Sequence, residues 1–356
     1  MSLIDRRRLL AAAGAFALPG RAQARTAIRL PALQAFLDGY VAARKLPGAA
    51  AALVRRGEPA AFAAAGTVAF DSPTPAGPGT LFRIYSMTKP VIGLAVMKLI
   101  EDGRLGLDQP VAEVLPEFRE QRVLVNAQTM ETRPAARPMT IRHLLTHSAG
   151  LSYSISSNAL AKLYVRNGIV PGGRVRDKEP GADLPPVRTL DELAERLARL
   201  PLDFDPGTKW QYSVSFDLLG LVIERAARRP LHAHLQRAIF DPLRMSDTDF
   251  MVPAAKAERF VSVVGPVKDG TAAIVEDRRT SPYLRDRDLP SGGGGLASSA
   301  RDYARFTAML LNEGALDGRR IVRPATVATY RSNLLEPGVF FGGRNGYGAG
   351  VSVVLP

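Results

Sequence analysis

The sequence predicts an α/β protein of the α+β type, in which helices flank an antiparallel sheet and a mostly helical domain is inserted. Three observations support this fold class. Strand-like patterns lie near both ends of the chain, helical patterns dominate its middle, and 356 residues are enough for two domains. We therefore expect a split sheet domain over residues 27–110 and 290–356, with a helical insertion domain over residues 111–289.

The N-terminal part is predicted, in order, as helix, hairpin, strand and helix. Apolar residues recur at helical spacing over residues 31–44, and a Pro-Gly pair follows them. Residues 49–56 and 59–68 flank a Gly-Glu turn, which predicts a β-hairpin. A short strand is expected over residues 81–85 and a helix over residues 87–101, which an Asp-Gly pair ends.

The rest of the chain is predicted from its turns, helix caps and periodicity. Pro, Gly and Arg concentrate at residues 126–138 and 167–188, which we expect to be long surface loops. Cap residues and apolar spacing predict further helices, and alternation predicts a last strand. These elements are helices over residues 140–147 and 215–228, helices that begin at Thr189 and Ser299, and a strand over residues 346–355.

Composition and charge exclude several classes of protein. Hydrophobic residues make up 46% and charged residues 23% of the chain, which is ordinary for a globular protein. Cysteine is absent, so disulfides and thiolate sites are excluded. The net charge is +13, but no Lys/Arg block is longer than Arg6–Arg8, so we expect no nucleic-acid partner. No apolar run reaches the ~18 residues of a membrane span, so we expect no stable membrane insertion.

The first 24 residues have the pattern of an export signal. Three arginines, Arg6–Arg8, precede an apolar stretch over residues 9–18, and residues 22–24 supply an Ala-x-Ala cleavage site. Paired arginines before two leucines are similar to a twin-arginine signal. We expect removal of residues 1–24 and a periplasmic or secreted protein that begins at Arg25. The alternative is an uncleaved N-terminal helix.

Ser86 and Lys89 form a Ser-x-x-Lys tetrad at the junction of a predicted strand and helix. Side chains three residues apart share one helix face, so the amine is expected beside the hydroxyl. A serine hydroxyl is a weak nucleophile unless a base takes its proton. A lysine can do so only if its surroundings lower its pKa from ~10.4. The alternative is an ordinary helix start with a surface lysine.

Tyr212 follows an Asp-Pro-Gly-Thr turn and precedes the helix predicted over residues 215–228. A tyrosine on such a loop can present its phenol to a site, where it can exchange protons with a serine or a leaving group. The alternative for Tyr212, taken alone, is a packed aromatic residue.

Five segments of the chain form one ordered pattern. They are residues 86–89, 99–107, 139–151, 204–220 and 291–310. Together they resemble the serine hydrolases of the class C β-lactamase fold, and most closely the family VIII carboxylesterases. The resemblance implies a β-lactamase/transpeptidase-like fold and acyl transfer through a covalent acyl-serine. It implies that Ser86 is the nucleophile, Lys89 its general base and Tyr212 the proton donor to the leaving group. It further implies that the backbone N–H of Ser86 forms half of an oxyanion hole.

The tyrosine motif departs from the β-lactamase pattern. Where the lactamases have Tyr-x-Asn, this chain has Tyr212-Ser213-Val214. A valine cannot hydrogen-bond the side-chain amide of a penicillin or cephalosporin. We therefore predict that Val214 is a substrate-binding residue in an apolar wall, which favours simple esters over β-lactams.

A second departure lies near the C-terminal end. The family carries a third motif, Lys-Thr-Gly or its His-x-Gly or Trp-x-Gly equivalent, on a strand that provides the other oxyanion donor. No such motif follows Tyr347, because Trp210 is the only tryptophan and no histidine follows His234. We therefore expect the C-terminal strand or strands of the fold to be missing, either because this is a fragment of a longer open reading frame or because the protein is truncated. A truncated protein would expose the edge of an apolar strand.

We expect neither a metal nor a cofactor. His143 and His147 have a metal-ligand spacing but lack a third ligand, and so do His232 and His234. The run Gly292–Gly295 lacks the residues of a phosphate-binding loop. Its place before a capped helix indicates close backbone packing instead.

These residues lead to three functional hypotheses. The first is an exported serine hydrolase that cleaves short-chain carboxylic esters, with a small-molecule ester as its partner. The second, within the same fold, is a β-lactamase or a D-alanyl carboxypeptidase that acts on the cell wall. The third, which the missing motif motivates, is a catalytically inactive binding protein that captures peptides or wall fragments. The sequence does not indicate an oligomeric state.

Overall fold

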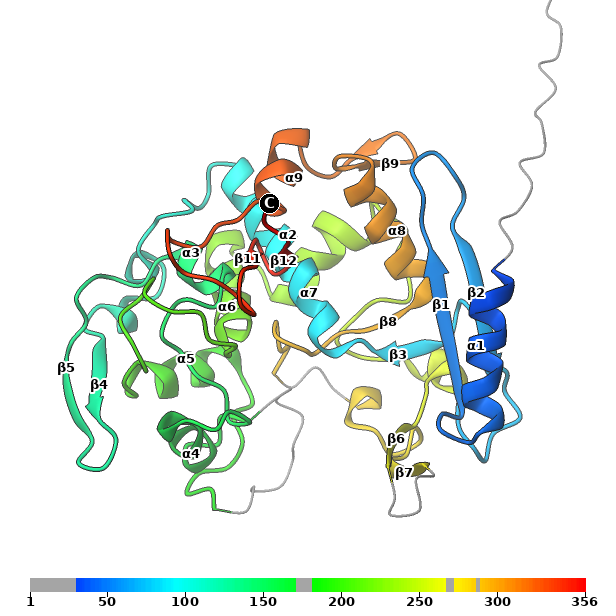
Figure 1. Ribbon diagram of the computed structural model, residues 1–356, viewed down its shortest axis with the longest axis horizontal. Coiled ribbons are helices and arrows are strands. Elements are labelled where there is room, and N and C mark those ends of the chain that lie inside the picture. Colours follow the sequence, from blue (N-terminus) through cyan, green and yellow to red (C-terminus); the bar gives the residue numbers. More distant parts are fainter. Residues whose placement is uncertain (1–29, 171–180, 267–271, 286–288) are drawn as a thin grey trace, which may run out of the picture.

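The computed structural model describes four stretches of the chain, residues 30–170, 181–266, 272–285 and 289–356 (Figure 1). The expected export signal over residues 1–24 lies outside the described residues, as does part of the loop predicted over residues 167–188. No helix in the described stretches has the length and apolar character that crossing a membrane requires.

Six of the helices in the described ranges lie where caps and apolar periodicity predict them, and the helices over residues 159–166, 231–235 and 324–330 were not predicted. Thr140, Thr189 and Ser299 each accept a backbone N–H from the third residue of the helix that follows. The α-helices are α1 (Pro31–Ala42), α2 (Thr88–Glu101), α3 (Ile141–Leu145), α4 (Ala159–Arg166), α5 (Leu190–Ala198), α6 (Ser215–Ala227), α7 (Leu231–Leu235), α8 (Ala300–Leu311) and α9 (Pro324–Tyr330).

The strands form antiparallel pairs. β1 (Gly48–Leu53) pairs with β2 (Ala61–Gly66), which is the predicted N-terminal hairpin. β3 (Leu81–Arg83) pairs with β8 (Ala297–Ser299) and joins the N-terminal part of the chain to the C-terminal part. The other pairs are β4 (Arg122–Asn126) with β5 (Glu131–Pro134), β6 (Val263–Pro266) with β7 (Ala272–Glu276), β9 (Ala315–Leu316) with β10 (Arg319–Arg320), and β11 (Gly346–Tyr347) with β12 (Ser352–Val353). Across the described ranges the strands thus form two-stranded pairs rather than one continuous sheet.

Two local predictions were wrong. Residues 126–138 were predicted as a loop but contain β5, because the side chain of Asn126 accepts two backbone N–H groups and closes a turn between β4 and β5. The single strand predicted over residues 346–355 is the hairpin β11–β12. Gly350, with a φ of +85°, lies in the left-handed region and turns the chain between the two short strands.

Helices α2 and α6 pack against each other in the main hydrophobic core. In Figure 1, α1 and the β1–β2 hairpin lie on one side of this core, with α8 next to β1, and α4, α5 and β4–β5 lie on the other side. The C-terminal segment packs on α2 at very short range, since a Cβ added to Gly93 would lie 2.0 Å from the carbonyl oxygen of Ala349. Gly93 therefore allows the backbone near β11–β12 to approach α2.

Gly93→Ala is expected to destabilise the protein by about 1–3 kcal/mol, because the added methyl group meets backbone rather than a flexible side chain. Gly39→Ala is a matched control within helix α1, where an added Cβ meets nothing within 4 Å. That variant is expected to gain about 0.5–1 kcal/mol, because alanine favours the helix. Urea denaturation of both variants checks the prediction. A Gly93→Ala protein as stable as the wild type would contradict the close contact.

Candidate active site

A sharp turn places Ser86 between strand β3 and helix α2. Tyr85, Ser86 and Met87 form a 3₁₀ turn, and Tyr85 has a φ of +42°, which is uncommon for a residue other than glycine. The carbonyl of Met87 accepts a hydrogen bond from the phenol of Tyr303 at 3.0 Å, which ties the turn to α8. A backbone of this kind persists where surrounding contacts hold it, so Ser86 has a defined position.

The strand that leads into this turn is anchored by the buried side chain of Arg83. Its guanidinium donates to Glu276 at 2.5 Å and to Ser281 at 2.9 Å, and it lies 4.1 Å from the centroid of the Phe260 ring. A third bond, of 2.6 Å, reaches the carbonyl of Val261. These contacts link β3 to β7 and to the segment before β6, and they fix the strand from which the Ser86 turn begins.

The side chains of Ser86, Lys89 and Tyr212 bring their polar atoms together. Lys89 Nζ lies 3.2 Å from Ser86 Oγ and 2.5 Å from Tyr212 Oη, and the two oxygens lie 2.5 Å apart. Lys89 is only 2% exposed, and its Nζ also lies 4.5 Å from the centroid of the Tyr212 ring. The three residues predicted to act together thus form a closed triangle of hydrogen-bonding distances.

Lys89 has a further oxygen neighbour that the sequence did not reveal. Its Nζ donates to the backbone carbonyl of Gly293 at 2.6 Å. The glycine run Gly292–Gly295, which includes Gly293, packs tightly on α6, since a Cβ on Gly292 would lie 2.2 Å from the carbonyl oxygen of Phe216. The close backbone packing predicted for Gly292–Gly295 is present, and it brings a carbonyl to the amine.

The segment that carries Tyr212 is held by His147. The Nδ1 of His147 lies 3.1 Å from Ser213 Oγ, its carbonyl accepts the N–H of Gln211 at 2.9 Å, and its ring centroid is 4.8 Å from that of Tyr212. Burial, together with the positive charge of Lys89, lowers the pKa of His147 well below its ordinary value. A neutral imidazole therefore packs against the ring of Tyr212.

His143 and His147 each contact protein groups through Nδ1. His143 Nδ1 accepts the backbone N–H of Thr140 at 3.1 Å, and burial lowers the pKa of its ring to about 4. His147 contacts Ser213, as described above. Over the described part of the chain, no group of three or more His, Cys, Asp or Glu side chains is placed to hold a metal ion.

The side chain of Val214 is apolar and is not part of the triangle of Ser86, Lys89 and Tyr212. It is 4% exposed, belongs to the main hydrophobic core and immediately precedes α6. Its neighbour Ser213 is also buried, and its hydroxyl lies 2.8 Å from the hydroxyl of Ser215. The substrate-binding role of Val214 stays a prediction.

The C-terminal hairpin and the segment before it contact the Tyr212 segment through aromatic side chains. The ring of Trp210 lies 4.5 Å from that of Phe341 and 5.8 Å from that of Tyr347, and Tyr347 lies 5.6 Å from His147. Aromatic pairs at these centroid distances pack favourably. Phe341 and Tyr347 thus pack against Trp210, and Tyr347 also packs against His147, the residue that holds the Tyr212 segment.

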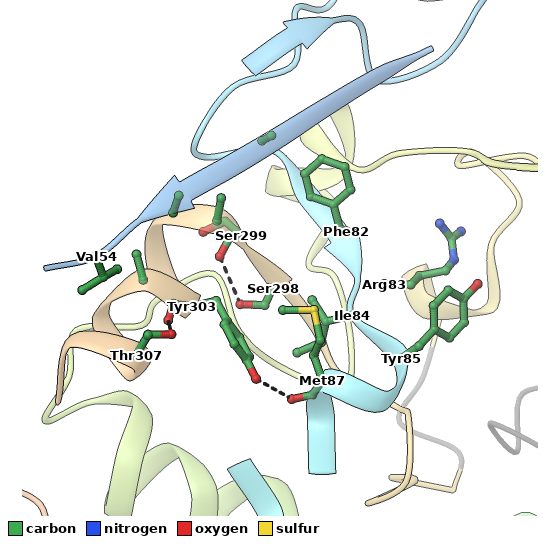
Figure 2. A pocket seen from close by; sticks show the side chains of 14 residues that line it. Val54, Phe82, Arg83, Ile84, Tyr85, Met87, Ser298, Ser299, Tyr303 and Thr307 are labelled. Carbon is green, nitrogen blue, oxygen red and sulfur yellow. Dashed lines mark hydrogen bonds between the residues drawn. The ribbon is translucent and has the colours of Figure 1, made fainter. Parts of the chain in front are cut away.

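A cavity of about 550 Å³ lies beside the Ser86 turn (Figure 2). Residues of β1, β3, β8 and α8 line it, and so do Tyr85 and Met87, the neighbours of Ser86 in the sequence. Figure 2 shows the Tyr303 phenol bonded to the Met87 carbonyl next to this cavity. Because Tyr85 and Met87 are 53% and 47% exposed, accessible apolar surface flanks the candidate nucleophile.

Comparison with known proteins places this geometry in a family. The family model described as Beta-lactamase matches residues 33–354. Over 300 residues the chain is 36% identical to Esterase EstB of Burkholderia gladioli, a similarity that covers 80% of this chain and 71% of that protein.

Two solved structures extend the comparison. The first is EstCE1, a hydrolase with promiscuous acyltransferase activity, with a TM-score of 0.72, 26% identity, and coverage of 91% of this chain and 82% of that one. The second is the octameric penicillin-binding protein homologue from Pyrococcus abyssi, with a TM-score of 0.64, 26% identity, and coverage of 91% of this chain and 65% of that one.

These similarities confirm the predicted resemblance and the β-lactamase/transpeptidase-like fold, in which helices combine with antiparallel strands. They also support ester hydrolysis by an enzyme of this fold. The chain belongs to the Beta-lactamase family, as a serine hydrolase similar to the family VIII carboxylesterases.

Proposed function

We propose that this chain cleaves short-chain carboxylic esters through an acyl-serine intermediate. The observation on which this rests is the triangle of Ser86 Oγ, Lys89 Nζ and Tyr212 Oη, with sides of 3.2, 2.5 and 2.5 Å. Nucleophilic catalysis needs a hydroxyl in contact with a base, and this triangle supplies both together with a second proton carrier. The similarity to Esterase EstB supports an ester as the substrate.

In the proposed first step, Lys89 takes the hydroxyl proton while Ser86 Oγ attacks the ester carbonyl. The backbone N–H of Ser86 is one donor to the oxyanion that forms. Tyr212, within 2.5 Å of both Lys89 Nζ and Ser86 Oγ, then passes a proton to the leaving alkoxide and takes one from Lys89. Water attacks the resulting acyl-serine, and its proton returns through the same groups as the acid leaves and the Ser86 hydroxyl is restored.

The residues after Tyr212 support esters as better substrates than β-lactams. Val214 has no polar side-chain atom, and the hydroxyl of Ser213 is buried and engaged by His147 and Ser215. Neither side chain can offer an amide to the side-chain amide of a penicillin or cephalosporin. A small ester has no side-chain amide to bind, so the triangle and the oxyanion donor are sufficient for its hydrolysis.

The proposal is tested by comparing turnover of p-nitrophenyl butyrate with turnover of a chromogenic cephalosporin. We expect faster turnover of the ester and, after an acid quench, a butyryl group on the peptide that contains Ser86. Faster turnover of the cephalosporin would replace the ester assignment with a β-lactamase. A protein that hydrolyses neither compound and is not labelled by a fluorophosphonate would instead be a binding protein.

Tyr212→Phe is expected to lower kcat for p-nitrophenyl butyrate by about 10²–10⁴-fold, because the proton carrier between Lys89 and the leaving group is lost. The ring, and with it the packing against His147, is retained. Tyr153→Phe is the matched control, since the Tyr153 ring lies 5.6 Å from that of Tyr212 but outside the triangle. Steady-state assays should show near wild-type kcat for the control. Equal effects in the two variants would argue against proton transfer by Tyr212.

A further inference from the structure

A buried carboxyl group next to the triangle has no part in the steps above. Asp217 is the third residue of α6 and is 5% exposed. We propose that Asp217 is a positioning residue: it holds the carbonyl of Gly293 against Lys89, and so aims the lone pair of the lysine amine at Ser86. This inference rests on the proposed function, because it explains how the base of that reaction is oriented.

Asp217 organises the glycine run through neighbouring polar groups. Its Oδ1 accepts the hydroxyl of Ser291 and the N–H of Gly293, the latter at 3.2 Å. The oxygen of Ser291 in turn accepts the N–H of Gly294 at 3.1 Å. A Cβ on Gly293 would lie 2.5 Å from Asp217 Oδ2, so the carboxyl group packs directly on this residue. Gly293 is thus held by Asp217 through its N–H and contacts Lys89 through its carbonyl.

The oxygen atoms around Lys89 Nζ indicate how the Gly293 carbonyl orients the amine. In the base form that the proposed mechanism requires, the amine of Lys89 has two N–H bonds and one lone pair, and its Nζ has three oxygen neighbours. The two closer ones are Gly293 O at 2.6 Å and Tyr212 Oη at 2.5 Å, and the third is Ser86 Oγ at 3.2 Å. When the two closer oxygens accept the N–H bonds, the lone pair faces the hydroxyl whose proton it must take. Without the Gly293 acceptor, the amine can turn an N–H towards Ser86 instead.

The negative charge of Asp217 has a second effect that can be measured separately, on the pH dependence of the reaction rate. Burial raises the pKa of Asp217, and its bond to Ser291 and the positive charge of Lys89 oppose that rise. The titratable groups around Lys89 are Asp217, Tyr212 and His147, and Asp217 also faces Tyr153. A carboxylate near an amine favours the protonated amine. Its removal is therefore expected to move the acid limb of the rate–pH profile to lower pH.

A variant of Asp302 serves as a control that separates the positioning role of Asp217 from the general effect of a carboxyl group at the start of a helix. It is also the third residue of its helix, α8, and is also buried. Its carboxyl group accepts the hydroxyl of Thr248 at 2.9 Å and the N–H of Asp247 at 2.7 Å rather than any group of the glycine run. Asp302→Ala therefore removes a buried helix-start carboxyl group of the same kind, without touching the contacts of Lys89.

The test measures p-nitrophenyl butyrate kinetics and the rate of fluorophosphonate labelling of Ser86 across the neutral and alkaline range. In Asp217→Ala we expect the kcat plateau to fall by about 10²-fold with little change in KM, because the base is misaligned. Asp217→Asn keeps an Oδ1 acceptor and is expected to recover most of the plateau. In both variants the acid limb should move down by about 1 pH unit. Asp302→Ala should lose thermal stability but keep the wild-type plateau and acid limb.

If Asp217→Ala does not fold, Ser291→Ala is the variant to test, because it removes one donor to Asp217 and one of the two acceptors of the Gly294 N–H, while the carbonyl of Ser291 remains. We expect a lower plateau at nearly wild-type Tm. A wild-type kcat plateau in either folded variant, or an unmoved acid limb in Asp217→Ala, would overturn the positioning role. A wild-type protein that is neither active nor labelled would reject the proposed function itself, so the two failures are distinct.

Discussion

Ser86→Ala is expected to abolish hydrolysis of p-nitrophenyl butyrate, with a loss of about 10⁴–10⁶-fold in kcat. In the proposed mechanism Ser86 Oγ is the atom that forms the bond to the acyl group, whereas Lys89 and Tyr212 move protons. Deleting this hydroxyl leaves Lys89 bonded to Tyr212 and to Gly293, so the variant should keep its fold. Initial-rate assays and circular dichroism measure the two effects separately.

Ser154→Ala is the control for the loss of a serine hydroxyl. The oxygen of Ser154 is buried and has no hydrogen-bond partner within the described residues, so its removal breaks no bond there. We expect wild-type kcat and wild-type labelling by a fluorophosphonate in this variant. If Ser86→Ala kept its activity as well, the acyl group would have to form on another residue, and the triangle would lose its assigned role.

The parts of the site that could be predicted are those that local spacing decides. Ser86 and Lys89 lie one helical turn apart, so their proximity follows from the sequence alone. Tyr212 is 123 residues from Lys89, and only the family resemblance connected the two. The Gly293 carbonyl could not be predicted, because a backbone acceptor has no side-chain signature. Asp217 was missed because an acidic residue in the first turn of a helix is common for electrostatic reasons alone.

The fold shows the same division between local and tertiary determinants. Thr140, Thr189 and Ser299 begin helices because each cap bonds a residue three positions ahead. The strands β11 and β12 are only two residues each, too short for an alternating pattern to define them. Their place depends on the turn at Gly350 and on the contact between Gly93 and Ala349, which no local pattern encodes.

Lys89→Met is expected to lower kcat by about 10²–10⁴-fold, because the group that takes the Ser86 proton is lost while the length of the side chain is kept. The matched control is Lys98→Met on the same helix. Lys98 is partly exposed and pairs with Asp102 at 3.4 Å, a contact of the kind that contributes little. Steady-state kinetics should therefore show a wild-type kcat for Lys98→Met and a large loss for Lys89→Met.

The rate–pH profile separates a lost base from a lost packing contact in Lys89→Met. Lys89 is almost wholly buried, with three oxygen neighbours on Nζ, so a methionine there leaves Gly293 and Tyr212 without their donor. If Lys89 is the base, the acid limb of the wild-type profile disappears in the variant, and the residual rate rises with hydroxide concentration, since hydroxide must then remove the Ser86 proton. If Lys89 only packs, the limb stays in place and the whole profile falls by one factor. A profile of the second kind would reject Lys89 as the base and would remove the reason for holding the Gly293 carbonyl beside it.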